Sequence, residues 1–228
     1  MPPRCLLYYI TDRTAFAADE PTRRRRLLEK IHEATRAGVD YIQLREKDLP
    51  TADLESLARE AMNAIREARK LATDPWQPAT ALLINSRTDV ALAIQADGVH
   101  LRSNDISAQE VKAIWAKCGA GTPARQRSPE APLIAVSCHS PAEVTLAAAN
   151  GADLVVFAPV FEKKDAIPAG LESFRQASKN VIPVLALGGV TFANAHACLA
   201  AGAAGIAAIR LFQENNVAEV VGRLRQKN

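Results

Sequence analysis

Eight short apolar runs recur along the chain, and a segment with helical spacing follows each of them. The runs cover residues 6–11, 41–45, 81–85, 98–101, 133–137, 154–160, 181–187 and 205–209. Such runs are typical of parallel strands that helices cover on the outer face. Eight strand–helix units within 228 residues predict an α/β protein, a single-domain (β/α)8 TIM barrel. The alternative is an open doubly wound sheet, but no Gly-x-Gly-x-x-Gly motif follows the first run, which weakens its dinucleotide-binding version.

Composition limits the partners that such a barrel could have. The net charge of +3 gives no electrostatic sign of a nucleic-acid partner. Cys5, Cys118, Cys138 and Cys198 have no metal-binding spacing, and no apolar run has the length of a membrane span or a signal peptide. We therefore expect a cytoplasmic protein with reduced thiols and with no nucleic-acid or membrane partner.

Residues 119–131 interrupt the alternation of strands and helices. The stretch is rich in Gly, Pro, Arg and Ser, which break regular structure and favour turns. It predicts a loop inserted at the surface of the barrel.

The segment 41–48 (YIQLREKD) gives the strongest indication of a ligand site. Side chains alternate between the faces of a strand, so Gln43, Arg45 and Lys47 share one face. Because helices are expected to cover the other face, these side chains should converge on the interior at the C-terminal end of the strand. Cations gathered there favour an anionic ligand such as phosphate or pyrophosphate, whereas a solvated edge strand is the alternative.

Other candidate residues follow later strands, at the end of the barrel where active sites lie. They are Asn85, His100, Asp105, Ser137, His139, Lys163, Lys164, Gly188 and Gly189. Gly188-Gly189 would let backbone N–H groups approach a phosphate, although a tight turn without a ligand is the alternative. His139 could move protons near neutral pH or be structural, and His100 is as easily packed as catalytic. Cys138 faces away from Ser137 and His139, so it is the weaker nucleophile candidate.

Six segments together resemble the thiamine phosphate synthase/TenI superfamily. They follow the family order from the first strand to the last and so cover nearly the whole chain. The segments are YITD at 9–12, IQLREKD at 42–48, ADGVHL at 96–101, GAD at 151–153, APVF at 158–161 and ALGGV at 186–190.

The resemblance implies a (β/α)8 barrel in thiamine biosynthesis. A thiamine phosphate synthase joins hydroxymethylpyrimidine pyrophosphate to thiazole phosphate and expels pyrophosphate, with Mg²⁺. Matched residue by residue, the pyrimidine would lie by Gln43 and Ser137, and the pyrophosphate by Arg45, Lys47 and Asn85. Asp105 would be a magnesium ligand, and Gly188 with its neighbours would bind the thiazole phosphate.

Two departures from the synthase pattern bear on the activity. The segment Asn85-Ser86-Arg87 has a hydroxyl where the synthase has a magnesium-binding aspartate, and hard cations favour anionic oxygens. The Thr-x-Thr-Lys loop of synthases is also absent from residues 161–165 (FEKKD), where Lys163 or Lys164 would have to supply the cation.

TenI-like proteins share both departures, and the resemblance extends to a thiazole tautomerase that aromatises its substrate by proton transfer without metal. His139 would match its acid–base residue. We therefore expect a tautomerase without a cofactor, ahead of a divergent Mg²⁺-dependent synthase and of a non-catalytic ligand-binding barrel. The expected partners are thiazole phosphate and, for a synthase, the pyrimidine pyrophosphate; the sequence leaves a homo-oligomer open.

Overall fold

The computed structural model describes residues 4–71, 79–119, 131–162 and 167–226. The predicted insertion at 119–131 falls almost entirely outside these residues, as do Lys163 and Lys164.

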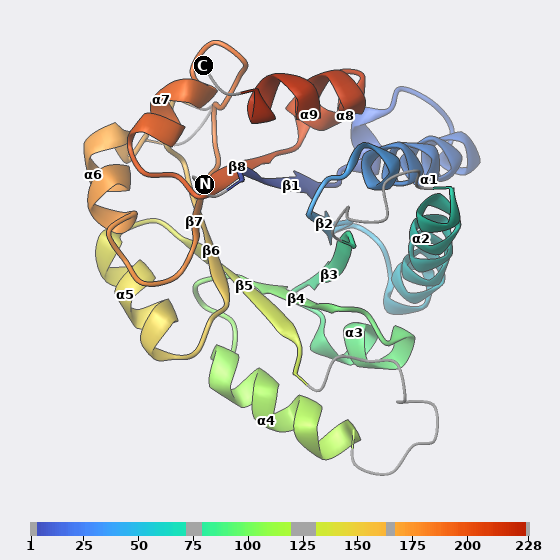
Figure 1. Cartoon of the computed structure of the whole chain (residues 1–228). Helices are drawn as coiled ribbons and strands as arrows, with labels where there is room; N and C mark the ends of the chain where they lie inside the picture. The colour runs from blue at the N-terminus through green and yellow to red at the C-terminus, as the bar shows by residue number, and fades with distance from the viewer. Residues whose placement is uncertain (1–3, 72–78, 120–130, 163–166, 227–228) are drawn as a thin grey trace.

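The strands form a closed parallel barrel in sequence order, which confirms the predicted (β/α)8 fold (Figure 1). β1 pairs with both β2 and β8, so the alternative of an open sheet is wrong. The strands are β1 (Leu6–Ile10), β2 (Tyr41–Leu44), β3 (Ala81–Asn85), β4 (Gly98–Leu101), β5 (Leu133–Cys138), β6 (Leu154–Phe157), β7 (Val184–Ala186) and β8 (Gly205–Ala208).

Helices surround this barrel, and their bounds follow the expected alternation. They are α1 (Glu20–Ala37), α2 (Thr51–Lys70), α3 (Thr88–Ile94), α4 (Ala108–Gly119), α5 (Pro141–Ala149), α6 (Gly170–Ala177), α7 (Ala195–Ala200) and α9 (Val217–Arg225). Two short elements were not predicted, the 3-10 helix η1 (Arg13–Ala15) and the helix α8 (Arg210–Gln213). Both directly follow strands, at the end of the barrel where the candidate residues lie.

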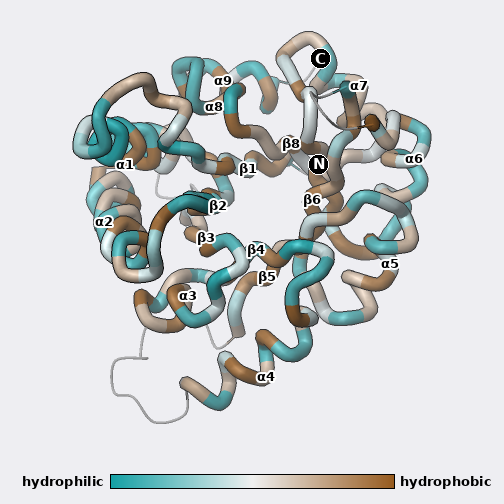
Figure 2. Tube along the Cα trace, turned by 180° about the vertical axis from the view of Figure 1, so that it is seen from behind, coloured by the Kyte–Doolittle hydropathy of each residue, from teal (hydrophilic) through white to brown (hydrophobic). Residues whose placement is uncertain are grey.

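Strand alternation divides the apolar side chains into two layers. Tyr8, Leu83, Ala135 and Val156 belong to the cluster inside the barrel. Their strand neighbours belong to the larger cluster between the strands and the helices. Figure 2 shows the apolar strands at the centre and hydrophilic segments on the surrounding helices. The inner positions at the C-terminal ends of the strands are therefore the ones that can face a ligand.

Two strands are at least three residues shorter than predicted, because a proline interrupts each run. β6 ends at Phe157 and not at residue 160, since Pro159 has no N–H to donate. β7 begins at Val184 and not at residue 181, after Pro183. Val160 and Phe161 still donate to the carbonyls of Leu187 and Gly188, which keeps the β6–α6 loop beside the end of β7.

A repeated aspartate closes the N-terminal end of the barrel. Asp40, Asp97 and Asp153 precede β2, β4 and β6, and each accepts a backbone N–H from the strand before it. The donors are Leu7 to Asp40 at 2.8 Å, Leu82 to Asp97 at 2.7 Å and Ile134 to Asp153 at 2.8 Å. The carboxylates thus satisfy backbone donors that the barrel would otherwise bury without partners.

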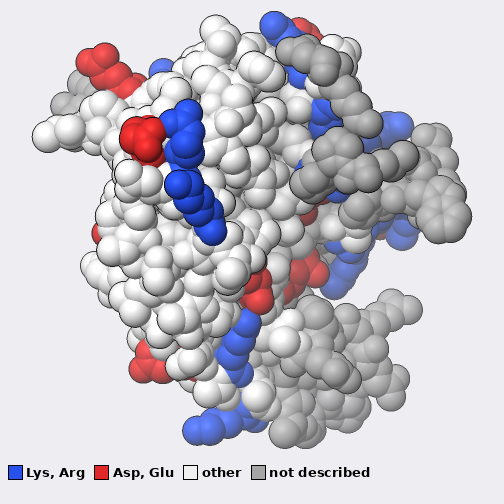
Figure 3. All heavy atoms as spheres, turned by 60° about the vertical axis from the view of Figure 1, so that its left-hand side comes forward, with Lys and Arg blue, Asp and Glu red and all other residues white. Residues whose placement is uncertain are grey.

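Charged side chains of both signs lie on the face of the barrel formed by α5, α6 and α7. Figure 3 shows few charged side chains on the face toward α5, α6 and α7, with both signs interspersed. Within the described ranges, no helix is long and apolar enough to span a membrane. Homo-oligomerisation stays a prediction.

Candidate active site

Gln43 and Asn85 lie side by side on neighbouring strands at the C-terminal end of the barrel. Gln43 is only 2% exposed, and its Nε2 donates to Asn85 Oδ1 at 2.7 Å. The oxygen of the same amide group, Gln43 Oε1, has no hydrogen-bond partner among the described residues. A buried acceptor without a donor is costly, so its position favours a ligand that supplies an N–H or O–H group.

Arg45 follows Gln43 on the same inward face, just beyond the end of β2. Its backbone N–H donates to Thr11 Oγ1 at 3.0 Å. The residue is half-buried, and its guanidinium forms no hydrogen bond or ion pair with any residue that the structure describes, while its charge is close enough to depress the pKa of His100. A guanidinium of a half-buried arginine with no acceptor of its own favours an anionic ligand at this point. Lys47 is exposed two residues farther along.

His100 lies inside the barrel and connects Ser137 to Tyr8. Its Nε2 lies 2.7 Å from Ser137 Oγ, and its Nδ1 lies 2.7 Å from the Tyr8 hydroxyl. Burial, with a smaller contribution from the nearby Arg45 charge, lowers the pKa of His100 to about 3. The ring is therefore neutral at physiological pH, so one nitrogen donates and the other accepts. The sequence left His100 between packing and catalysis, and the structure shows it packed and hydrogen-bonded to a site residue.

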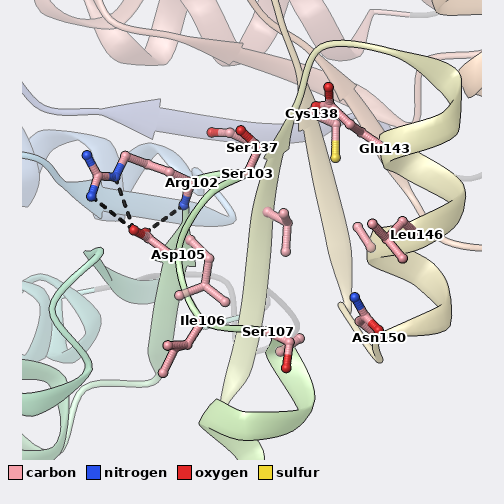
Figure 4. A pocket seen from close by; sticks show the side chains of 14 residues that line it. Arg102, Ser103, Asp105, Ile106, Ser107, Ser137, Cys138, Glu143, Leu146 and Asn150 are labelled. Carbon is pink, nitrogen blue, oxygen red and sulfur yellow. Dashed lines mark hydrogen bonds and ion pairs between the residues drawn. The ribbon is translucent and has the colours of Figure 1, made fainter.

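Ser86 and Asp105 meet after β3 and β4. Ser86 Oγ donates to Asp105 Oδ2 at 2.6 Å from a left-handed backbone conformation (φ 55°). The backbone N–H and the guanidinium of Arg102 also donate to Asp105, as Figure 4 shows. Burial opposes ionisation of Asp105, but the hydrogen bonds from Ser86 and Arg102 outweigh it and lower the pKa of the carboxyl group. Asp105 is therefore an anion held by two neighbouring loops.

These residues fit a magnesium ion only in part. In the described part of the chain, no three His, Cys, Asp or Glu side chains come together as a metal site. Mg²⁺ is usually held by one or two carboxylates together with substrate phosphates and water. Asp105 supplies one carboxylate and Ser86 a neutral oxygen, which is sufficient only when the substrate phosphates complete the coordination.

Ser137 and Cys138 lie beside a pocket between the loop after β4 and helix α5. Figure 4 shows their side chains on opposite sides of β5, with Leu146 of α5 and Asn150, which directly follows this helix, across the pocket. Cys138 is buried, and burial raises the pKa of its thiol to about 12. The expectation that Cys138 faces away and is a poor nucleophile agrees with this environment.

His139 lies at the exposed end of β5, on the rim of the barrel. Its Nδ1 contacts the carbonyl oxygen of Ala158 at 2.6 Å, so this nitrogen must carry the proton. Its backbone N–H donates to Glu143. This geometry leaves Nε2 exposed and does not decide whether His139 acts on a substrate, so its catalytic role stays a prediction.

The two glycines after β7 have a packing reason for lacking side chains. Gly188 and Gly189 have φ values of 91° and 67°, which side-chain-bearing residues rarely adopt. A Cβ atom on Gly188 would lie 2.7 Å from Pro159, and one on Gly189 would lie 2.7 Å from the carbonyl oxygen of Glu162. Contact with the β6–α6 loop thus explains both glycines without a ligand, and their role in phosphate binding stays a prediction, as does that of Lys163 and Lys164.

Comparison with known proteins shows the family of the chain. The thiamine monophosphate synthase (TMP-TENI) family matches residues 7–212. A thiamine-phosphate synthase of Methanoculleus marisnigri is 37% identical over 227 residues, which cover 97% of this chain and 94% of the relative. One from Roseiflexus castenholzii is 36% identical over 211 residues, 90% of this chain and 80% of the relative. The structure of thiamine phosphate pyrophosphorylase from Pyrococcus furiosus superposes with a TM-score of 0.74 at 30% identity and covers 96% of this chain and 93% of its own. The chain therefore belongs to the thiamine monophosphate synthase family, as the sequence segments predicted.

Proposed function

We propose that the chain is a thiamine phosphate synthase, which transfers hydroxymethylpyrimidine from its pyrophosphate to thiazole phosphate. Relatives named thiamine-phosphate synthase over almost the whole chain support this activity over the tautomerase that the sequence favoured. The single observation that carries the proposal is the half-buried Arg45, whose guanidinium has no acceptor among the described residues. A pyrophosphate leaving group would supply that acceptor.

The polar pair on β2 and β3 suits the pyrimidine pyrophosphate. Gln43 Oε1 is a buried acceptor that could receive an N–H of an aminopyrimidine. Asn85 accepts from Gln43 through its oxygen, which leaves its own NH₂ group out of that bond and able to donate to a ligand. Together with Arg45 and Lys47, that amide could donate to pyrophosphate oxygens. Donors fixed before the substrate arrives stabilise the charge that develops as the pyrophosphate leaves.

Ser137 would lie near the pyrimidine methylene carbon, which is transferred from the pyrophosphate to the thiazole phosphate. When its hydroxyl donates to Nε2 of neutral His100, the other ring nitrogen donates to Tyr8. The oxygen lone pairs of Ser137 then remain available to a ligand at the C-terminal end of the barrel, where they would favour positive charge on the pyrimidine methylene carbon. His100 thus acts by orienting a hydroxyl and not by taking up a proton.

Asp105 and Ser86 are the residues that would hold a magnesium ion. Bound together with the substrate phosphates, the ion would neutralise charge on the pyrophosphate. Asp105 keeps its negative charge because Ser86 and Arg102 donate to it, and these donors already occupy part of the carboxylate. The backbone around Gly188 is the proposed site for the phosphate of the thiazole.

The test is the formation of thiamine phosphate by the purified protein and by two arginine variants. Arg45→Gln should lower kcat/KM by a factor on the order of 10², since it removes a charged donor to the leaving group. The control Arg24→Gln removes a guanidinium that binds Glu60 and Ser56 on the helix surface, and it should leave the rate unchanged. Equal rates for wild type and Arg45→Gln would refute the proposal.

A tautomerase remains the second candidate, and the contact between Ser86 and Asp105 favours it. One carboxylate that already accepts from Ser86 and Arg102 makes a weak metal site. Aromatisation of the thiazole phosphate would need no metal and would use His139 as acid–base residue. It predicts turnover that is unchanged in EDTA and is lost in His139→Ala; full activity of that variant would exclude this mechanism.

A further inference from the structure

Arg13 is a buried cation that holds three carboxylates at the edge of the proposed site. It begins η1 directly after β1 and is only 3% exposed. Its Nε donates to Glu20 at 2.6 Å, its Nη1 to Glu46 at 3.2 Å, and Nη1 and Nη2 donate to the two oxygens of Asp48 at 2.7 and 2.9 Å. The bidentate geometry with Asp48 is the strongest arrangement that an arginine offers a carboxylate.

Glu46 is the buried member of this group and depends on Arg13 most directly. It is 5% exposed and accepts from the backbone N–H of Arg13 at 3.0 Å and from Thr11 Oγ1 at 2.5 Å. Thr11 Oγ1 in turn accepts the backbone N–H of Arg45 at 3.0 Å. The network therefore reaches the backbone of the residue that carries the unpartnered guanidinium.

Glu46 and Asp48 alternate in sequence with the two proposed anion-binding residues, Arg45 and Lys47. β2 ends at Leu44 and residues 47–49 form a turn, so no strand ladder fixes the direction of these four side chains. The bonds of Arg13 hold the carboxylates of Glu46 and Asp48 beside η1. Because both carboxylates are bound there, neither pairs with Arg45.

We infer that Arg13 is a positioning residue, which keeps Glu46 and Asp48 away from Arg45 and thereby keeps the pyrophosphate site cationic. Without Arg13, these carboxylates would lose their main counter-charge, and Arg45 is the cation next to Glu46 in the chain. A carboxylate would then neutralise Arg45 before a ligand arrived. This inference rests on the proposed function, because it takes pyrophosphate as the ligand of Arg45.

The test measures binding of inorganic pyrophosphate by calorimetry, in EDTA, to the full-length protein. We expect Arg13→Gln to weaken binding by about tenfold or more, because one lost charge-assisted contact commonly changes affinity on this scale. Arg13→Lys keeps the charge but cannot bind two carboxylates at once, so an intermediate loss is expected. Arg24→Gln is the matched control, since Arg24 also binds a glutamate through two nitrogens but lies between α1 and α2.

A rescue variant separates positioning from general loss of structure. If Arg13 acts by holding the carboxylates back, adding Asp48→Asn to Arg13→Gln should recover at least part of the lost affinity. A simple loss of folding would be left unchanged or made worse by the second substitution. Failure of the rescue at an unchanged urea midpoint would overturn the inference.

Hydrogen exchange of the peptide that spans residues 45–49 gives a readout that needs no catalysis. Faster exchange in Arg13→Gln than in Arg24→Gln is expected whether or not the wild type forms thiamine phosphate. A wild type that binds pyrophosphate but forms no product would refute the proposed function and leave the inference standing. Unchanged exchange and affinity in Arg13→Gln, or no pyrophosphate binding by the wild type, would overturn the inference itself.

Discussion

The protonation of His100 leads to a prediction about how stability depends on pH. Burial and the Arg45 charge lower its pKa to about 3 in the folded protein, whereas an unfolded chain gives histidine a pKa of about 6.5. At a pH between these two pKa values, His100 is mostly protonated in the unfolded chain and mostly neutral in the folded protein. Protons therefore favour unfolding, and the stability contributed by this residue is present above pH 6.5 and is lost as pH falls toward 3.

The size of the effect follows from this difference. Between pH 5 and pH 7 the free energy of unfolding should rise by about 2 kcal/mol because of His100 alone. The figure depends mainly on the unfolded value, because at pH 5 the folded histidine is already neutral. His100→Gln keeps hydrogen-bonding groups for Tyr8 and Ser137 but has no group that titrates, so the variant should lack this rise.

The assay is urea unfolding of wild type and His100→Gln at pH 5 and pH 7, followed by circular dichroism. For each protein, the free energy of unfolding at pH 5 is subtracted from that at pH 7. The result for the variant is then subtracted from the result for the wild type, so that the contributions of groups that titrate in both proteins cancel. The wild type should gain about 2 kcal/mol more than the variant. Equal gains would mean that His100 takes up its proton in the folded barrel, and the orientation assigned to Ser137 would then be wrong.

Three further predictions test other parts of the site and the fold. Ser86→Asp places a second carboxylate beside Asp105 and should tighten Mn²⁺ binding by about tenfold, since Mn²⁺ prefers the same anionic oxygens as Mg²⁺. Electron paramagnetic resonance measures the affinity, and an unchanged affinity would show that residues 86 and 105 do not form a metal site. Asp153→Ala leaves the backbone N–H of Ile134 without its acceptor and removes one of the two acceptors of Lys112, so urea unfolding should show a loss of about 1 to 3 kcal/mol. A loss below ~0.5 kcal/mol would contradict the role given to the repeated aspartates. Gly189→Ala should lower the melting temperature because its φ of 67° and its contact with the β6–α6 loop exclude a Cβ atom, and an unchanged melting temperature would show that the loop yields freely.

The fold could be predicted because each barrel strand leaves a local signal. A short apolar run needs only its own residues and the helix that follows to be recognised. Alternation then placed Gln43 and Arg45 on one face, and the structure brings Gln43 to Asn85 as that alternation requires. These inferences depend on spacing within one strand and on the order of strands, both of which are visible in the sequence.

The contacts that define the site could not be predicted, because they join residues far apart in the chain. His100 meets Ser137 and Tyr8 only when the stagger of the barrel brings β4 to β5 and to β1 inside the lumen. Ser86 meets Asp105 through two loops of independent shape. No periodicity in the sequence encodes such distances.

Arg13 was missed although one signal pointed to it. Alternation placed Glu46 on the outer face of a strand that helices were expected to cover, and a buried carboxylate needs a cation. The nearest arginine that follows another strand end is Arg13. The glycines at 188 and 189 show a different case, because the sequence predicted the approach of a phosphate, whereas Pro159 and Glu162 are the neighbours that the structure gives them.

The most direct test of the proposed activity is a paired assay of the wild-type protein by mass spectrometry. One sample contains hydroxymethylpyrimidine pyrophosphate, aromatic thiazole phosphate and Mg²⁺, and the other contains the non-aromatic thiazole tautomer and EDTA. We expect thiamine phosphate and an equal amount of pyrophosphate in the first sample. Product only in the second sample would contradict the synthase and identify a tautomerase that kept the barrel and its anion site but not the coupling reaction.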